Sequence, residues 1–89
     1  LTSEITVAQL CKITGMSKSQ LYREFTTAFG ISPKQFVLNV RITHARLLLQ
    51  QEGISVKEAC YASGFSDPNY FVRAFKKVVG VTPGKMARK

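Results

Sequence analysis

The sequence predicts an all-α fold of two helix-turn-helix units joined by a long central linker helix. Three observations support this expectation: apolar residues recur at helical spacing, no segment reads as a strand, and a pattern of about 29 residues occurs twice. At 89 residues, 45% of them apolar, the chain suits a single small domain rather than a large enclosed active site. We therefore expect one domain, with the first helix-turn-helix over 1–32, the linker over 33–51 and the second unit with a C-terminal helix over 54–89.

The central helix is predicted over 33–51, with Ser32 as its N-cap, Pro33 in its first position and Gly53 as its stop. A helix of this length spans roughly 28 Å. Its polar residues fall on one narrow stripe, made of Gln35, Asn39, Arg46 and Gln50. Apolar residues line two flanks, one with Phe36, Val37, Val40, Leu47 and Leu48 and the other with Leu38, Ile42, Ala45 and Leu49. A helix that is apolar on two flanks is expected to join two packed units as a rigid strut.

The repeat relates Ile5–Gly15 to Ile54–Gly64 at an offset of 49 residues. After one extra residue in the second copy the offset becomes 50, and five residues then match again: Leu21, Arg23, Phe25, Gly30 and Pro33 correspond to Phe71, Arg73, Phe75, Gly80 and Pro83. A repeat of this length predicts two units of the same local structure, one on each side of the central helix.

Each copy reads as two helices around a turn glycine. In the first copy we expect Thr6 to cap a helix over 7–14, with Val7, Leu10 and Cys11 facing inward, and Gly15 to end it. Ser17 is then expected to cap a helix over 18–29, whose core-facing residues are Leu21, Phe25 and Phe29.

In the second copy Ser55 is expected to cap a helix over 56–63 that ends before Gly64. Either Ser66 or Asp67 would cap the next helix, which runs to about Val79 with Pro68 in its first turn. A last short helix is expected to begin at Thr82 and Pro83.

The charge of the chain favours a polyanionic partner. Thirteen Lys and Arg against five Asp and Glu give a net charge of +8. The second helix of each copy leaves donors, acceptors and aromatic rings outward, namely Lys18, Ser19, Tyr22 and Arg23 in the first and Asp67, Asn69, Tyr70 and Arg73 in the second. Such side chains on a helix are what reading of base edges in the DNA major groove requires. The alternative is a basic helical module that docks on an acidic protein.

The second copy carries the most specific motif in the chain, from Gly64-Phe65-Ser66-Asp67-Pro68-Asn69-Tyr70 through Arg73-Ala74-Phe75-Lys76-Lys77 to Gly80-Val81-Thr82-Pro83. Together with Arg41-Ile42, Ala45 and Leu47-Leu48 of the central helix, it resembles the C-terminal DNA-binding domain of AraC/XylS-family bacterial transcription regulators. The resemblance covers nearly the whole chain.

The resemblance implies two homeodomain-like helix-turn-helix units whose recognition helices enter successive major grooves of double-stranded DNA, in a bacterial transcription regulator. It implies base contacts from Lys18, Ser19, Tyr22, Arg23, Asp67, Pro68, Asn69, Tyr70 and Arg73. Candidate contacts to the DNA backbone are Lys34, Arg46, Ser55, Lys76, Lys77 and Lys85, and several of these side chains are expected to be simple solvated charge.

The resemblance also implies partners outside this chain. RNA polymerase is one candidate, and a separate effector-sensing, receiver or dimerisation domain is another. We therefore expect the chain to be a C-terminal domain excised from a longer regulator. Family members usually carry a further helix before the first motif, whereas only Leu1–Glu4 precede it here, so we expect the first unit to be less completely packed.

Two arginines carry open alternatives. Arg73 is expected to read a base, with guanine suited to its bidentate fork, and the alternatives are a phosphate contact or an ion pair with Asp67. Arg23 is balanced between a base contact and a hold by Glu24 or by phosphate.

Other residues of the two helices also have alternative roles. Tyr22 and Tyr70 are each balanced between DNA contact and half-buried packing. Asn69 would bond adenine or only cap its helix, and Asp67 is expected to be an N-cap, with a cytosine contact as the alternative.

The cysteines and the histidine indicate no catalytic, redox or metal-binding site. Cys11 and Cys60 stand at matching places four residues before each turn glycine, so we expect small core residues there rather than a disulfide or a redox site. His44 and two separated cysteines make no zinc pattern, and no nucleophile, base and orienting group form a recognisable set. We expect no metal, no cofactor and no enzymatic activity. No apolar run reaches membrane-spanning length and no signal peptide opens the chain, so a cytoplasmic location fits.

Overall fold

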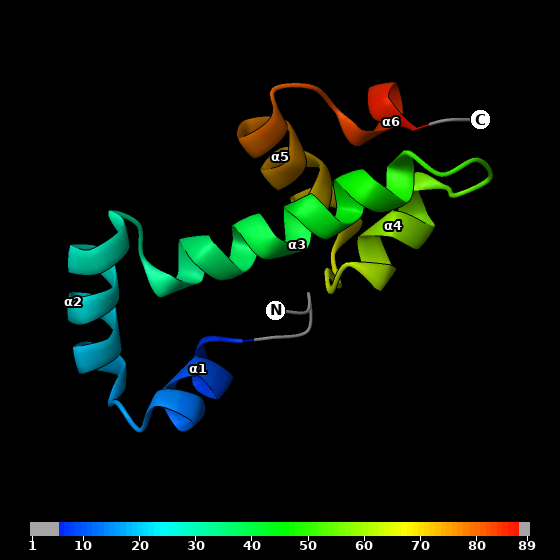
Figure 1. The fold of residues 1–89 in the computed structure, drawn as a ribbon. Helices are drawn as coiled ribbons and strands as arrows, with labels where there is room; N and C mark the ends of the chain where they lie inside the picture. The colour runs from blue at the N-terminus through cyan, green and yellow to red at the C-terminus, as the bar shows by residue number, and fades with distance from the viewer. Residues whose placement is uncertain (1–5, 88–89) are drawn as a thin grey trace. The chain divides into compact units, whose positions relative to one another are not determined.

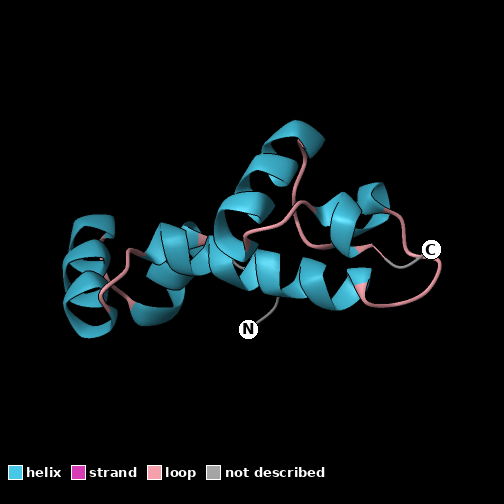
Figure 2. Ribbon diagram, turned by 90° about the horizontal axis from the view of Figure 1, so that it is seen from above, coloured by secondary structure: helices cyan, strands magenta, loops and turns pink. Residues whose placement is uncertain are grey.

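A computed structural model describes residues 6–87, and these residues form helices and no strand (Figures 1 and 2). The helices are α1 (Val7–Thr14), α2 (Lys18–Phe29), α3 (Pro33–Leu49), α4 (Val56–Ala62), α5 (Pro68–Val79) and α6 (Pro83–Met86). The fold class predicted from the sequence is confirmed: two helix-turn-helix subdomains are joined by a long helix. The expectation about Leu1–Glu4 falls outside the described residues.

The chain divides into two compact units, Leu1–Val40 and Arg41–Lys89, so that the division falls within α3. The first unit holds α1, α2 and the N-terminal half of α3. The second holds the rest of α3 with α4, α5 and α6. Each unit is therefore a helix-turn-helix that uses one half of the central helix as its additional packing element.

Two helix ends differ from the sequence prediction by one or two residues. The central helix ends at Leu49 rather than Gln51, because the Gln51 N–H donates to the Leu48 carbonyl at 3.0 Å and so tightens the last turn into a 3₁₀-type bond. In α4 the last helical residue is Ala62, and Ser63 is the C-cap. The Phe65 N–H then donates to the Cys60 carbonyl at 3.0 Å across Gly64, whose φ of 94° is a left-handed conformation that glycine adopts without strain.

The sequence repeat recurs in the hydrogen bonds that begin the units. Thr6 and Ser55 both form capping boxes, in which the hydroxyl accepts the N–H of the third helical residue and that residue's side chain accepts the cap N–H. For Ser55 and Glu58 the two distances are 3.0 Å and 3.1 Å.

The repeat recurs again just before the turns. Thr14 Oγ1 donates to the Leu10 carbonyl at 2.8 Å, and Ser63 Oγ donates to the Ala59 carbonyl. The two residues occupy matching places, yet Thr14 is exposed and Ser63 is fully buried. A buried hydroxyl needs such a partner, because leaving it unpaired would cost about 1–3 kcal/mol.

The second unit has a well-filled core. Its aromatic rings lie close together, with 4.9 Å between the centroids of Phe65 and Phe71 and 5.7 Å between those of Phe71 and Phe75. Every element contributes buried residues to this core, namely Ile42, Ala45 and Leu49 of α3, Ala59 and Cys60 of α4, Phe65, Phe71, Ala74 and Phe75 around α5, and Pro83 of α6. Figure 1 shows the helices of this unit gathered around the second half of α3.

The first unit has a much smaller core. Among its described residues only Leu21, Pro33 and Val37 are buried, and α1 contributes none. The aromatic ring of Phe25 lies 5.3 Å from that of Phe36, but both side chains remain half-buried. Less apolar surface is therefore removed from water here, and we expect this unit to be the less stable of the two.

Of the residues predicted to face a core, Phe29 and Leu47 are exposed, and Cys11 is only half-buried. Phe29 is 66% exposed, because α1 lies beside the N-terminal turns of α2 and the last turn of α2 extends beyond it (Figure 1). Cys11 is half-buried while Cys60 is buried, since Met16 stands where the second unit has the buried ring of Phe65. Leu47 is 58% exposed, because the second unit packs on the opposite flank of α3.

Candidate nucleic-acid interface

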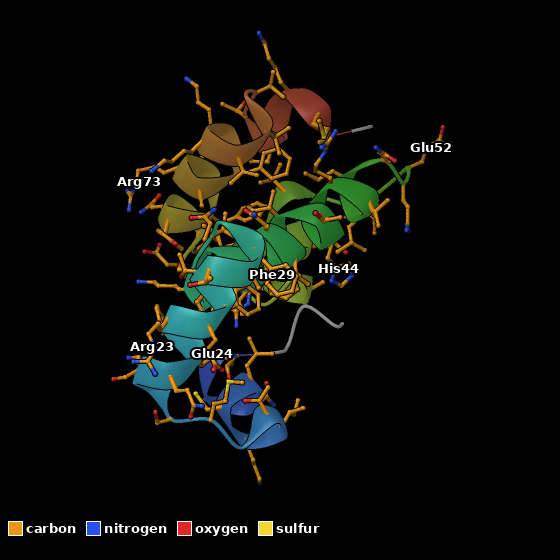
Figure 3. The ribbon with its side chains drawn as sticks, turned by 60° about the vertical axis from the view of Figure 1, so that its left-hand side comes forward. Arg23, Glu24, Phe29, His44, Glu52 and Arg73 are labelled. Atoms are coloured by element: carbon orange, nitrogen blue, oxygen red, sulfur yellow. The ribbon has the colours of Figure 1, made fainter. Side chains whose placement is uncertain are left out.

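In the first unit, α2 buries one face and leaves the other to solvent. Ser17 caps the helix by accepting the Gln20 N–H at 3.2 Å, and Leu21 anchors it in the core. The predicted base-reading residues all lie away from that core: Lys18, Ser19 and Arg23 are exposed and Tyr22 is half-buried. Figure 3 shows the side chains of Arg23 and Glu24 on this helix.

Three of these residues form a local feature that the sequence did not reveal. The ammonium group of Lys18 lies over the ring of Tyr22, 6.0 Å from its centroid, one helical turn away. Together with Ser19 these two side chains line a shallow, open hollow on the surface of α2.

In the second unit, α5 buries Phe71, Ala74 and Phe75 and presents its opposite face to solvent. The residues predicted to read bases, Asp67, Pro68, Asn69, Tyr70 and Arg73, are all exposed. Figure 3 shows the Arg73 side chain extending outward from α5. The ring of Tyr70 is 42% exposed and its centroid lies 6.1 Å from that of Phe65, so this residue combines packing with an accessible edge.

The contacts of Asp67, Arg73 and Arg23 bear on the predicted helix cap and on the two ion pairs that were alternatives to DNA contact. Asp67 is its N-cap: Oδ1 accepts the Asn69 N–H at 3.0 Å. Within residues 6–87 the guanidinium of Arg73 forms no ion pair with Asp67, and that of Arg23 forms none with Glu24. Both arginines of these faces are therefore available to an external partner.

Counting from the N-caps shows how the two faces correspond. Arg23 and Arg73 both occupy the sixth helical position. The aromatic residues do not correspond, because Tyr22 matches Val72 and Tyr70 matches Gln20. Sequence reasoning overlooked Val72, which is 37% exposed on the outward side of α5, and the cap-to-cap count would have found it.

The candidate backbone contacts Lys34, Arg46, Ser55, Lys76, Lys77 and Lys85 are all exposed. Ser55 is committed to its capping box, in which its own N–H already donates to Glu58 Oε1. The pKa of the Glu58 carboxyl lies below its ordinary value of 4.5, because this carboxyl is hydrogen-bonded to Ser55. The hydrogen bond to the Ser55 backbone lowers the pKa most, and the one to the Ser55 side chain lowers it further.

Positive charge is unevenly divided between the units. Residues 41–89 hold nine Lys and Arg against three Asp and Glu, whereas residues 1–40 hold four against two. Lys76 and Lys77 stand in the last turn of α5, while the last turn of α2 has no basic residue. The second unit is therefore better equipped to contact phosphates.

Neither a metal-binding cluster nor a membrane-spanning helix is found among the described residues. No three of their His, Cys, Asp or Glu side chains come together in a way that would hold a metal ion. None of the helices in the described part of the chain is long and apolar enough to cross a membrane.

Comparison with known proteins identifies the arrangement. A family model described as a helix-turn-helix domain matches residues 10–89. The chain is 38% identical to the HTH-type transcriptional regulator GlxA of Rhizobium meliloti (strain 1021) over 80 residues, which are 90% of this chain and 25% of the relative. It spans about a quarter to a third of the length of the curated relatives it matches.

Solved structures give the same result. A probable AraC family transcriptional regulator from Rhodopseudomonas palustris CGA009 matches with a TM-score of 0.83 and 31% identity, over 96% of this chain and 83% of that one. The DNA-binding domain of AdpA, solved in complex with a target DNA, matches with a TM-score of 0.81 and 27% identity, over 91% of this chain and 73% of that one. The chain belongs to the AraC-type helix-turn-helix family of DNA-binding transcription regulators.

Proposed function

We propose that this domain binds double-stranded DNA sequence-specifically, with α2 and α5 as recognition helices in successive major grooves. The observation that carries this proposal is the repeated design of the two helices. Each buries one apolar face and holds at its sixth position an exposed arginine that has no ion pair within residues 6–87. A net charge of +8 and a DNA-bound structural relative support it.

The residues have distinct proposed roles. Base edges would be read by Lys18, Ser19, Tyr22, Arg23, Asp67, Pro68, Asn69, Tyr70 and Arg73. Asp67 accepts an N–H as a cap, so its contribution to reading would come mainly from fixing the start of α5. Phosphates would be held by Lys34, Arg46, Lys76, Lys77 and Lys85, and by the backbone around Ser55, with most of this charge in the second unit.

The whole protein is proposed to be a longer bacterial regulator that controls transcription in the cytoplasm. RNA polymerase and an effector-sensing, receiver or dimerisation domain are its proposed partners. These proposals rest on family membership and on the fraction of its relatives' length that the chain spans.

The test is selection of duplexes from a random library with the 89-residue chain, followed by a salt titration of the selected duplex. About six phosphate contacts predict a log–log slope of about −5. We expect the selected duplex to bind much more tightly than a scrambled duplex of the same composition. Equal affinity for both duplexes and for an acidic polypeptide would instead favour a module that docks on acidic proteins.

A further inference from the structure

The hollow on α2 brings three chemistries together. Lys18 supplies an ammonium with three donors, Ser19 a hydroxyl, and Tyr22 a half-buried aromatic ring. The 6.0 Å contact between the ammonium and the ring centroid holds the flexible lysine stem along the tyrosine. A lysine side chain otherwise has many rotamers, so this contact restricts where its donors point.

We propose that Lys18 and Tyr22 act as a single unit that reads a guanine next to a thymine, a proposal that rests on the proposed function. In the major groove guanine presents two acceptors, N7 and O6, which suit the lysine ammonium. Thymine is the one base with a 5-methyl group there, and an apolar ring beside the ammonium suits that methyl. The spacing of one helical turn places both groups on the same side of α2.

The second copy of the repeat lacks this pair of side chains, so the inference applies to α2 alone. The residue that matches Lys18 is Pro68, which has no donor, and the residue that matches Tyr22 is Val72, which has no ring. The two recognition helices therefore read different base pairs, and only the half-site read by α2 would couple a guanine contact to a thymine contact.

The experiment uses the duplex selected with the 89-residue chain. Each thymine is replaced by deoxyuridine and each guanine by 7-deazaguanine, one position at a time, and the Kd is measured by fluorescence anisotropy. With the wild-type chain we expect neighbouring positions where deoxyuridine weakens binding about fourfold, as for one methyl group, and where 7-deazaguanine weakens it at least about fivefold.

Variants test whether the two contacts are coupled. Tyr22→Ala should remove the deoxyuridine effect and also reduce the 7-deazaguanine effect at the neighbouring guanine, because the lysine is no longer held. Tyr22→Phe keeps the ring and should preserve both effects. Lys12→Gln removes one exposed positive charge from the same unit, outside the hollow, and should also leave both effects unchanged.

The outcomes separate this inference from the proposed function. If no duplex is enriched, DNA binding itself fails and the inference fails with it. If a duplex is enriched but no neighbouring guanine and thymine respond, only the reading unit is overturned. An unchanged 7-deazaguanine effect in Tyr22→Ala, with circular dichroism showing a folded chain, would mean two independent contacts and would also overturn it. If Tyr22→Ala is unfolded, Tyr22→Phe replaces it as the test, and loss of either effect in that variant would overturn the reading unit.

Discussion

The rings of Phe71 and Phe75 lie 5.7 Å apart, one turn apart on α5, and neither side chain is exposed to solvent. The matching pair in α2, Leu21 and Phe25, has one buried and one half-buried member. This difference at matching places is one reason why the described residues of the first unit bury fewer apolar side chains than those of the second.

The filled core predicts a large cost for removing one of its rings. Phe75→Ala should lower the free energy of unfolding of the second unit by about 3–5 kcal/mol, because it leaves a cavity among packed side chains. Phe29→Ala removes a ring of the first unit and serves as the control, and it should change the free energy of unfolding of that unit by about 1 kcal/mol or less, since that ring is 66% exposed. Urea denaturation followed by circular dichroism measures both, and equal costs would contradict the burial described for α5.

The capping box of α4 predicts a pH dependence. The Glu58 carboxylate is favoured in the folded state, where its pKa is lowered by the hydrogen bonds from Ser55. A depressed folded-state pKa means that this stabilisation is fully present above 4.5 and is lost as the pH falls through the lower folded-state value. Glu58→Gln keeps an acceptor but cannot titrate, so its stability should vary less with pH in that acidic range.

Stability curves of the wild type and Glu58→Gln between neutral and acidic pH provide the measurement. Parallel curves through the acidic range would show that the carboxylate is not held in the folded state. Ser55→Ala should cost about 1 kcal/mol near neutral pH, as for other N-cap replacements. It should reduce the Glu58 contribution without abolishing it, because the backbone N–H of residue 55 can still donate to Glu58 Oε1.

Much of the fold follows from local rules, which is why the sequence predicts it. The helix starts at Thr6, Ser17, Ser55 and Thr82 are set by side chains that accept a nearby N–H, and such contacts span three residues. Burial is different, because it depends on what lies opposite. Leu47 and Phe29 have the spacing of core residues, yet they remain 58% and 66% exposed, and the Phe25 ring, 4.7 Å from that of Phe29, covers only part of it.

The candidate site was predictable to the same degree. Helical periodicity placed the predicted base-reading residues on the outward faces of α2 and α5, where the structure has them. The contact between Lys18 and Tyr22 depends on rotamers, so it does not follow from spacing alone. The match of Tyr22 to Val72 does follow from the 50-residue offset of the repeat.

The two cysteines should differ in reactivity. Burial raises the pKa of the Cys60 thiol, and the nearby charge of Asp67 raises it further, so little thiolate is present near neutral pH. Cys11 is half-buried and more accessible. With a limiting amount of an alkylating reagent, mass spectrometry should find Cys11 modified first, and Cys60 should react only once the chain is unfolded. Faster modification of Cys60 in the native chain would contradict its burial.

Arg73 and Lys76 are expected to contribute differently to DNA binding although both are exposed on α5. Arg73→Ala should cost about 1–3 kcal/mol and relax preference at one base pair, because a guanidinium reads a base through paired donors. Lys76→Ala should weaken all duplexes alike and reduce the salt slope by about 1, because an ammonium on phosphate carries no sequence information. Lys57→Ala, an exposed lysine of α4 outside the proposed contacts, controls for simple loss of charge. Affinities across single-base variants of the selected duplex decide between these roles, and a uniform loss with Arg73→Ala would reassign that residue to a phosphate.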